Sequence, residues 1–135
     1  MKKYINCAFL YAILAMIGGI FYREFTKLME FTGKTTLSVV HTHYFVLGML
    51  FFLILTLLEK NFQFTNQKTT KAVTIYQIGL NLTTIMFVVR GITQVLQTSL
   101  TTGANATISG IAGIGHILLS VGLIIILLQL NRAIQ

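Results

Sequence analysis

Residues 37–58 of the chain read LSVVHTHYFVLGMLFFLILTLL. This run contains no lysine, arginine, aspartate or glutamate, and it is long enough to cross a hydrocarbon core about 30 Å thick as a helix. It therefore predicts a transmembrane helix. Two of the three histidines in the chain, His41 and His43, stand near its start. Imidazole is costly to place in hydrocarbon, so this pair suggests a ligand role before a packing role.

Three further apolar runs have the length of a membrane span, and the composition agrees with them. The chain has 135 residues, of which 55% are hydrophobic and only 10% charged, with a mean hydropathy of +0.80. The predicted spans are residues 4–22, 37–58, 70–96 and 108–130. We therefore expect one all-α domain over residues 1–135, an integral membrane four-helix bundle that crosses the bacterial cytoplasmic (inner) membrane several times. Such a chain has no room for a soluble catalytic domain.

The first span and the loops carry a few further signals. No small-residue cleavage motif precedes Arg23, so residues 4–22 are interpreted as a retained helix and not as a signal peptide. The first loop, residues 23–36, is long enough for a short helix at the membrane surface. The chain has no proline, which favours continuous helices, and its single cysteine, Cys7, predicts neither a disulfide nor a cysteine metal site.

The formal net charge of +7 is explained by where the basic residues stand. Most of them lie at the ends of spans, where they contact lipid headgroups, so the bilayer is the expected partner and nucleic acid is not. One side of the membrane receives Lys2, Lys3, Lys60, Lys68, Lys71 and Arg132, and the other receives Arg23, Lys27 and Lys34. This distribution predicts that both termini are cytoplasmic.

In that orientation, five polar residues come to a similar depth in the outer half of the bundle. They are His41 and His43 near the start of the second span, His116 near the start of the fourth, Arg90 late in the third and Arg23 at the end of the first. These five are the candidate cofactor-binding residues, and the three histidines are the candidate metal ligands.

His41 and His43 are two residues apart, which separates their side chains by about 200° on a regular helix. They are therefore expected to point to opposite faces and not to chelate one ion. Either the helix starts at or after His41, or each histidine serves a different site.

The segment Val39-Val40-His41-Thr42-His43-Tyr44 and the following Val46-Leu47-Gly48-Met49 resemble the His-x-His helix in the catalytic subunit of heme-copper oxidases. The resemblance implies that His41 corresponds to the ligand of the high-spin heme and His43 to that of the low-spin heme. The length of the chain is similar to one of the three four-helix arcs of that family. The chain lacks the family's adjacent histidine pair for copper and its cross-linked tyrosine motif, so the resemblance does not extend to oxygen reduction with proton pumping. The whole chain also resembles an uncharacterised family of small four-helix bacterial membrane proteins.

Two heme arrangements follow from these residues. In a symmetric homotrimer, His41 of one subunit would face His43 of the next and give a bis-histidine heme at each interface. Within one subunit, His43 and His116 would hold the heme between two helices. Phe45, Phe51 and Phe52 would line it, or they would face lipid or pack in the core. His116 has a further interpretation as a histidine bonded to a carbonyl or to Gln94.

Arg90 needs a polar partner inside the membrane. The alternatives are a salt bridge to Glu24 or Glu30 and a contact to a heme propionate. Its position on a polar stripe with Tyr76, Thr83, Gln94 and Gln97 indicates an inward face. Arg23 is most simply an anchor at the membrane surface.

The sequence contains no aspartate and no carboxylate within a span, which lowers the probability of proton-coupled transport or hydrolysis. The expected function is a heme b-binding, cytochrome-like membrane protein with a redox or heme-handling role, oligomeric and with a possible respiratory-chain partner. The alternatives are a copper-binding accessory protein for respiratory oxidase assembly that uses His41, His43 and His116, and a membrane scaffold without a cofactor.

Overall fold

The computed structural model describes all residues, 1–135, and contains helices and no strand. The elements in chain order are α1 (Lys2–Leu28), η1 (Thr36–Val39), α2 (Val40–His43), η2 (Tyr44–Leu50), α3 (Phe51–Phe62), α4 (Gln67–Val95) and α5 (Thr102–Ile134). The four elements from η1 to α3 follow each other without a break, so Thr36–Phe62 is one helical span. The chain thus has four helices long and apolar enough to cross a membrane, as predicted.

The helix ends differ most from the predicted spans in α1, which ends six residues later, and in α5, which starts six residues earlier and ends four residues later. α1 continues to Leu28 and includes Arg23, so no separate surface helix follows it. Glu30, just after the helix, has a φ of 51°, a left-handed conformation that stops helical propagation. The next spans start with side-chain caps, because Thr35, Asn66 and Thr101 each accept a hydrogen bond from a backbone N–H two or three residues further on.

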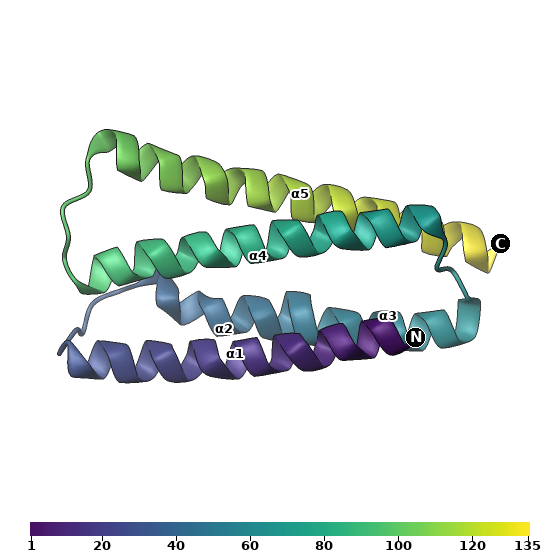
Figure 1. Cartoon of the computed structure of the whole chain (residues 1–135), viewed down its shortest axis with the longest axis horizontal. Helices are drawn as coiled ribbons and strands as arrows, with labels where there is room; N and C mark the ends of the chain where they lie inside the picture. The colour runs from purple at the N-terminus through teal and green to yellow at the C-terminus, as the bar shows by residue number, and fades with distance from the viewer.

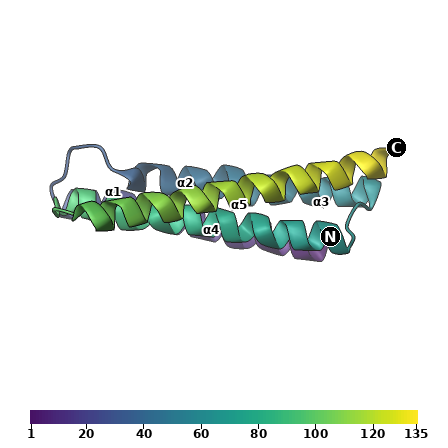
Figure 2. The same cartoon turned by 90° about the horizontal axis from the view of Figure 1, so that it is seen from above.

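Figures 1 and 2 show the four spans side by side, with both termini at one end of the molecule. We call this the terminal end; it also holds the connection between α3 and α4. The opposite end, called the far end, holds the connections from α1 to η1 and from α4 to α5. The span Thr36–Phe62 packs against both α1 and α4, and α4 packs against α5 (Figure 1). The orientation of this bundle in a membrane, with cytoplasmic termini, stays a prediction.

Aromatic rings fill the core on the terminal side of the bundle. Phe52 is fully buried and stacks on Tyr11 with ring centroids 5.6 Å apart, and Phe51 stacks on Tyr76 at 4.4 Å. Tyr4 continues the cluster toward Phe64. Offset stacks of this kind add stability beyond the area they bury.

α4 and α5 pack backbone to backbone through glycines. A Cβ at Gly122 would lie 2.7 Å from the backbone nitrogen of Tyr76, and one at Gly115 would lie 2.8 Å from that of Thr83. Gly79 on α4 faces the backbone of Leu119 just as closely. Small residues at a helix crossing allow this approach, which is a common packing mode in membrane proteins.

The second span contains a π-helical segment, η2, directly after His43. A π segment inserts an extra residue into an α-helix and disturbs its hydrogen-bond ladder. Here the Tyr76 hydroxyl on α4 donates to the carbonyl oxygen of Leu47 at 2.8 Å. Gly48, in the same segment, lies so close to the ring of Tyr11 that a Cβ would come within 2.6 Å of it. The span is therefore continuous but not a regular α-helix.

The outer surface of the bundle is apolar over most of its length. Exposed large side chains include Phe9, Ile13, Ile17 and Ile20 on α1, Val46, Leu50, Ile54 and Leu57 on the second span, and Ile117, Val121, Ile124 and Leu128 on α5. An apolar surface of this extent is expected for a protein surrounded by lipid and not for one surrounded by water.

Candidate functional site

His41 and His43 point to opposite sides of the second span, as the sequence predicts. His41 faces α1, where a Cβ at Gly19 would lie 3.6 Å from the His41 Cβ. Its Nδ1 is buried and has no hydrogen-bond partner. His43 faces α4, where its ring meets Phe87. The two histidines therefore belong to different environments within one chain.

His43 has a fixed ring orientation. Its Nδ1 lies 2.9 Å from the carbonyl oxygen of Val39, one turn earlier, and its ring meets Phe87 edge-on with centroids 4.8 Å apart. A carbonyl oxygen only accepts hydrogen bonds, so Nδ1 carries the proton. The lone pair is then on Nε2, the nitrogen left for a ligand.

His116 on α5 repeats this arrangement. Its Nδ1 lies 2.8 Å from the carbonyl oxygen of Ala112, and its ring contacts the same Phe87 with centroids 6.0 Å apart. The interpretation of His116 as a histidine bonded to a carbonyl is confirmed, whereas Gln94 instead accepts from the backbone N–H of Thr36. Phe87 thus contacts two imidazoles from two helices, each with its Nε2 outside these hydrogen bonds.

The surface of α5 one turn on either side of His116 includes small residues. His116 is exposed, and Gly113 and Ser120 lie one turn before and one turn after it on the same helix. A Cβ added at Gly113 would meet no atom within 4 Å, and the same is true at Gly110. A planar molecule bound through His116 would find open space above Gly113 and Gly110.

Arg90 joins α4 to the start of α5. Its Nη1 donates to Asn105 Oδ1 at 2.7 Å, and its Nη2 donates to Ser109 Oγ at 2.7 Å and to the Asn105 carbonyl at 3.3 Å. These neutral oxygens take the place of the salt bridge to Glu24 or Glu30 considered above. The guanidinium thus has no acid partner. Ser109 is seven residues before His116, which places this charge about 10 Å from His116 along the helix axis.

The side chain of Arg23 makes its one polar contact within α1. It pairs with the neighbouring Glu24 at 3.7 Å, the one ion pair of the chain, and both side chains are more than half exposed. This geometry agrees with an anchor at the membrane surface, and an exposed pair of this kind contributes little to stability.

The three candidate lining phenylalanines do not surround the histidines. Phe51 and Phe52 belong to the aromatic core around Tyr76 and Tyr11, and Phe45 packs against that core as a half-buried side chain. The three phenylalanines therefore pack in or against the core and do not line a site at the histidines. The aromatic residue at the histidines is Phe87, which the sequence does not distinguish from the other apolar residues of its span.

His41, His43 and His116 do not form a three-ligand group. No set of three or more histidine, cysteine, aspartate or glutamate side chains comes together in the chain. This arrangement therefore does not provide a copper site made of all three histidines of one chain.

Sequence reasoning missed a chain of hydrogen bonds between α1, the second span and α4. The Tyr44 hydroxyl donates to Asn81 Oδ1 at 3.0 Å, Asn81 Nδ2 donates to the Tyr11 hydroxyl at 2.9 Å, and that hydroxyl donates to Gln77 Oε1 at 3.3 Å. Cys7 donates to the same Gln77 oxygen at 3.7 Å. The available signal was the spacing of Gln77 and Asn81, which is one turn of α4. This network starts next to His43 and ends near the terminal end.

The comparisons with known proteins give one match. A family model described as "Protein of unknown function (DUF2871)" matches residues 1–133. No curated protein and no solved structure matches the chain significantly, so the resemblance of the His-x-His segment to heme-copper oxidases finds no support there. Because the family model covers nearly the whole chain, the chain belongs to the family described as "Protein of unknown function (DUF2871)".

Proposed function

We propose that this protein binds heme b in the half of the bundle next to the far end, with His116 and His43 as axial ligands. The observation that carries the proposal is the meeting of these two imidazoles at Phe87, each with its Nδ1 proton held by the carbonyl one turn earlier. Histidines that ligate metals commonly donate their second ring N–H in this way, which fixes the tautomer and the ring direction.

Three features of the region around His43 and His116 suit a bound heme. Imidazole is a common axial ligand of heme iron. The surface beside His116, at Gly113 and Ser120, offers room for a flat macrocycle. The Arg90 guanidinium, about 10 Å further along α5, suits a propionate because it is a permanent cation with a planar fork of donors.

Phe87 must move if both histidines are to reach one iron. Its ring contacts both imidazoles and therefore occupies the space between them. Phe87 is only half-buried, and a change of its side-chain rotamer gives both Nε2 atoms access to a shared ligand. His116 is the more exposed of the two and is the first ligand in this proposal.

When bound, heme supplies one-electron redox chemistry or binding of small ligands at iron, and the chain tunes it through ligation, hydrogen bonding and burial. The side chains of this site bind, orient and partly shield the group. The outer face of the bacterial cytoplasmic membrane is the proposed location, because the basic residues at the terminal end indicate a cytoplasmic side there.

The homotrimer with a heme between His41 and His43 of neighbouring subunits stays a competing prediction. Both rings face helices of their own chain, α1 for His41 and α4 for His43, which favours the site at His43 and His116.

The visible spectrum of protein purified after heme-replete expression tests the proposal, with His43→Ala, His116→Ala and His41→Ala compared. We expect heme bands that His116→Ala abolishes and His43→Ala converts from six-coordinate to five-coordinate type, while His41→Ala leaves them unchanged. His41 is a matched control, because it is a histidine of the same span on the other face. Loss of heme in His41→Ala but not in His116→Ala favours the intersubunit arrangement, and a colourless wild-type protein overturns the proposal.

A further inference from the structure

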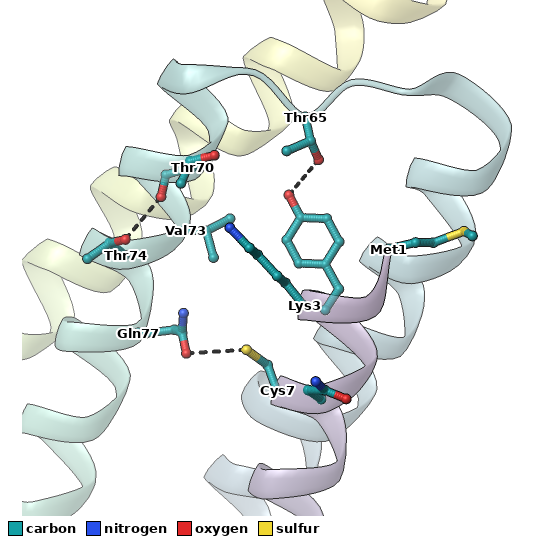
Figure 3. A pocket seen from close by; sticks show the side chains of 10 residues that line it. Met1, Lys3, Cys7, Thr65, Thr70, Val73, Thr74 and Gln77 are labelled. Atoms are coloured by element: carbon teal, nitrogen blue, oxygen red, sulfur yellow. Dashed lines mark hydrogen bonds between the residues drawn. The ribbon is translucent and has the colours of Figure 1, made fainter.

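A cavity opens between α1 and α4 at the terminal end, on the far side of the hydrogen-bond network from the histidines. It has a volume of about 460 Å³, and Lys3, Asn6, Cys7, Thr74 and Gln77 are among the side chains that line it (Figure 3). None of its lining residues is acidic. A basic cavity at the end of a membrane-spanning bundle needs an explanation that the proposed heme site does not supply.

Hydrogen bonds determine how Gln77 faces this cavity. Both the Tyr11 hydroxyl and the Cys7 thiol donate to Gln77 Oε1, at 3.3 and 3.7 Å. The carbonyl side of the amide is therefore occupied, and its Nε2 has no partner within the chain. Figure 3 shows this nitrogen on the side of Gln77 away from Cys7. Gln77 thus presents two N–H donors and no free strong acceptor to the cavity.

Lys3 brings a positive charge to the same place. Its side chain extends from α1 across the cavity toward Val73 on α4 (Figure 3). The chain's one ion pair is elsewhere, between Arg23 and Glu24. The nearby carboxylate of Glu59 is engaged by the backbone N–H and the hydroxyl of Thr65, at 2.9 and 2.7 Å. Lys3 therefore lacks an acid partner, and it brings a cation to the cavity that the two N–H donors of Gln77 also face.

The cavity borders a shallow strip on the surface of α4, and we call the cavity and this strip together the groove. A second, shallow depression of about 440 Å³ shares Thr74 and Gln77 with the first. It is lined by residues of α4 alone and extends past Asn81 along the apolar Ile78, Leu82 and Ile85 toward the middle of the bundle. Ile78 and Ile85 are about half exposed. Lys3 lies near the terminal end and Ile85 nearer the middle of the bundle, which is the order in which the head and the tail of a lipid follow each other in one leaflet.

We propose that this groove binds an amphiphile with an anionic head group, a carboxylate or a phosphate, and an acyl chain. The head accepts hydrogen bonds from Lys3 Nζ and Gln77 Nε2, and the chain lies along Ile78, Leu82 and Ile85. A lysine binds phosphate and carboxylate groups as a point charge, and the loss of one lysine from an anionic lipid contact corresponds to about a fivefold change in binding. An anionic phospholipid and a free fatty acid share this chemistry.

Native mass spectrometry of the purified protein, titrated with phosphatidylglycerol and with phosphatidylcholine of the same acyl chains, tests the proposal. We expect phosphatidylglycerol to bind at least fivefold more tightly. Lys3→Gln and Gln77→Leu should each remove most of this preference. Lys2→Gln, which deletes an equal charge one residue away and outside the cavity lining, should change it less than twofold. Equal losses in Lys2→Gln and Lys3→Gln, or equal binding of the two lipids, overturn the proposal.

Two competitors identify the source of the head group. Displacement of phosphatidylglycerol by sodium oleate shows that a carboxylate with a chain is accepted, and failure of oleate to displace it assigns the groove to phospholipid. Inorganic phosphate should not compete at equal concentration, because it lacks a tail. If inorganic phosphate competes equally well, the apolar strip has no role in binding, and the proposal that the ligand is an amphiphile is overturned.

Discussion

The imidazole of His43 meets the ring of Phe87 edge-on, with the two centroids 4.8 Å apart and the planes at 76°. Edge-to-face contacts of this kind contribute about 0.5–1.5 kcal/mol beyond the area they bury. His116 contacts the same ring from α5. Phe87 therefore stabilises the bundle when no ligand is bound and, in the proposed function, competes with heme for the space between the histidines.

Phe87→Ala separates these two effects. We expect the heme-free protein to lose about 1–3 kcal/mol of stability, because a half-buried aromatic side chain is removed. Heme affinity should rise, because both imidazoles become accessible without a rotamer change. Thermal unfolding and heme titration in detergent measure the two quantities. Phe9→Ala, which removes a ring that is 70% exposed on α1, is the control and should change neither. An unchanged or lower heme affinity in Phe87→Ala contradicts the role given to this ring.

Arg90→Gln tests the connection between α4 and the start of α5. Arg90 makes three hydrogen bonds to Asn105 and Ser109, so its loss should free the first two turns of α5. Amide hydrogen exchange over residues 102–109 is expected to accelerate about tenfold, which corresponds to about 1.4 kcal/mol of local stability. Heme affinity should fall as well if the guanidinium binds a propionate.

Arg132→Gln is the matched control for this change, because it removes the same charge near the end of α5 without such bonds. Equal exchange rates in Arg90→Gln and wild type would show that the three bonds do not hold α5 in place.

Gly79→Ala and Gly110→Ala compare the same change at two faces. A Cβ at Gly79 would meet the backbone of α5, 2.6 Å from the Gly115 carbonyl oxygen, whereas a Cβ at Gly110 would meet nothing within 4 Å. We expect Gly79→Ala to lower stability by about 1–3 kcal/mol through the forced separation of the helices. Gly110→Ala should be neutral or stabilising by up to about 1 kcal/mol, because alanine favours the helix. Thermal unfolding of both variants in the same detergent measures this difference. Similar melting temperatures would contradict the close contact between the backbones of α4 and α5.

The sequence was sufficient for the number of spans and for the opposite faces of His41 and His43, since both depend on helix length and on 3.6 residues per turn. It was insufficient for the partners of Arg90, which come from a helix that starts seven residues after α4 ends. The contact of Phe87 with both His43 and His116 depends on how three helices pack. The hydropathy pattern does not predict that packing, because Phe87 is one of many apolar residues in these three helices.

The π segment was missed for a related reason. An amphipathic helix shows an insertion as a shift of its polar stripe, but residues 44–50 include no charged side chain and thus no stripe to shift. From the sequence we identified a polar stripe through Tyr76 and Thr83 but did not identify the hydrogen-bond network at Gln77 and Asn81. Both of the latter side chains are indeed fully buried, whereas Gln94 and Gln97 are exposed.

Asn81→Leu and Tyr44→Phe measure the network between the spans. Asn81 accepts from Tyr44 and donates to Tyr11, so Asn81→Leu leaves two tyrosine hydroxyls with fewer partners. Hydrogen bonds between membrane helices contribute about 0.6 kcal/mol on average and up to about 1.7 kcal/mol. We expect about 1–2 kcal/mol for Asn81→Leu and less for Tyr44→Phe. The double variant should lose less than the sum, because the two residues share one bond. Additive losses in a double-mutant cycle would contradict that bond.

Deletion of Val46 tests the extra residue in the second span. An α-helix that contains one inserted residue forms a π segment and keeps its flanks in register, so removal of one residue within that segment restores a regular helix. Val46 is exposed, and its deletion should leave His43 facing α4 and Phe52 facing Tyr11. The bond from Tyr76 to Leu47 should be lost, with a cost of about 0.6–1.7 kcal/mol. Deletion of Ile54, an exposed apolar residue in the regular helix α3, is the matched control. It should rotate the flanking residues by about 100° relative to each other and turn Leu55 away from the core, which abolishes folding.

Melting temperature and monodispersity in detergent compare the two deletions. If both deletions are equally damaging, the segment at residues 44–50 contains no surplus residue.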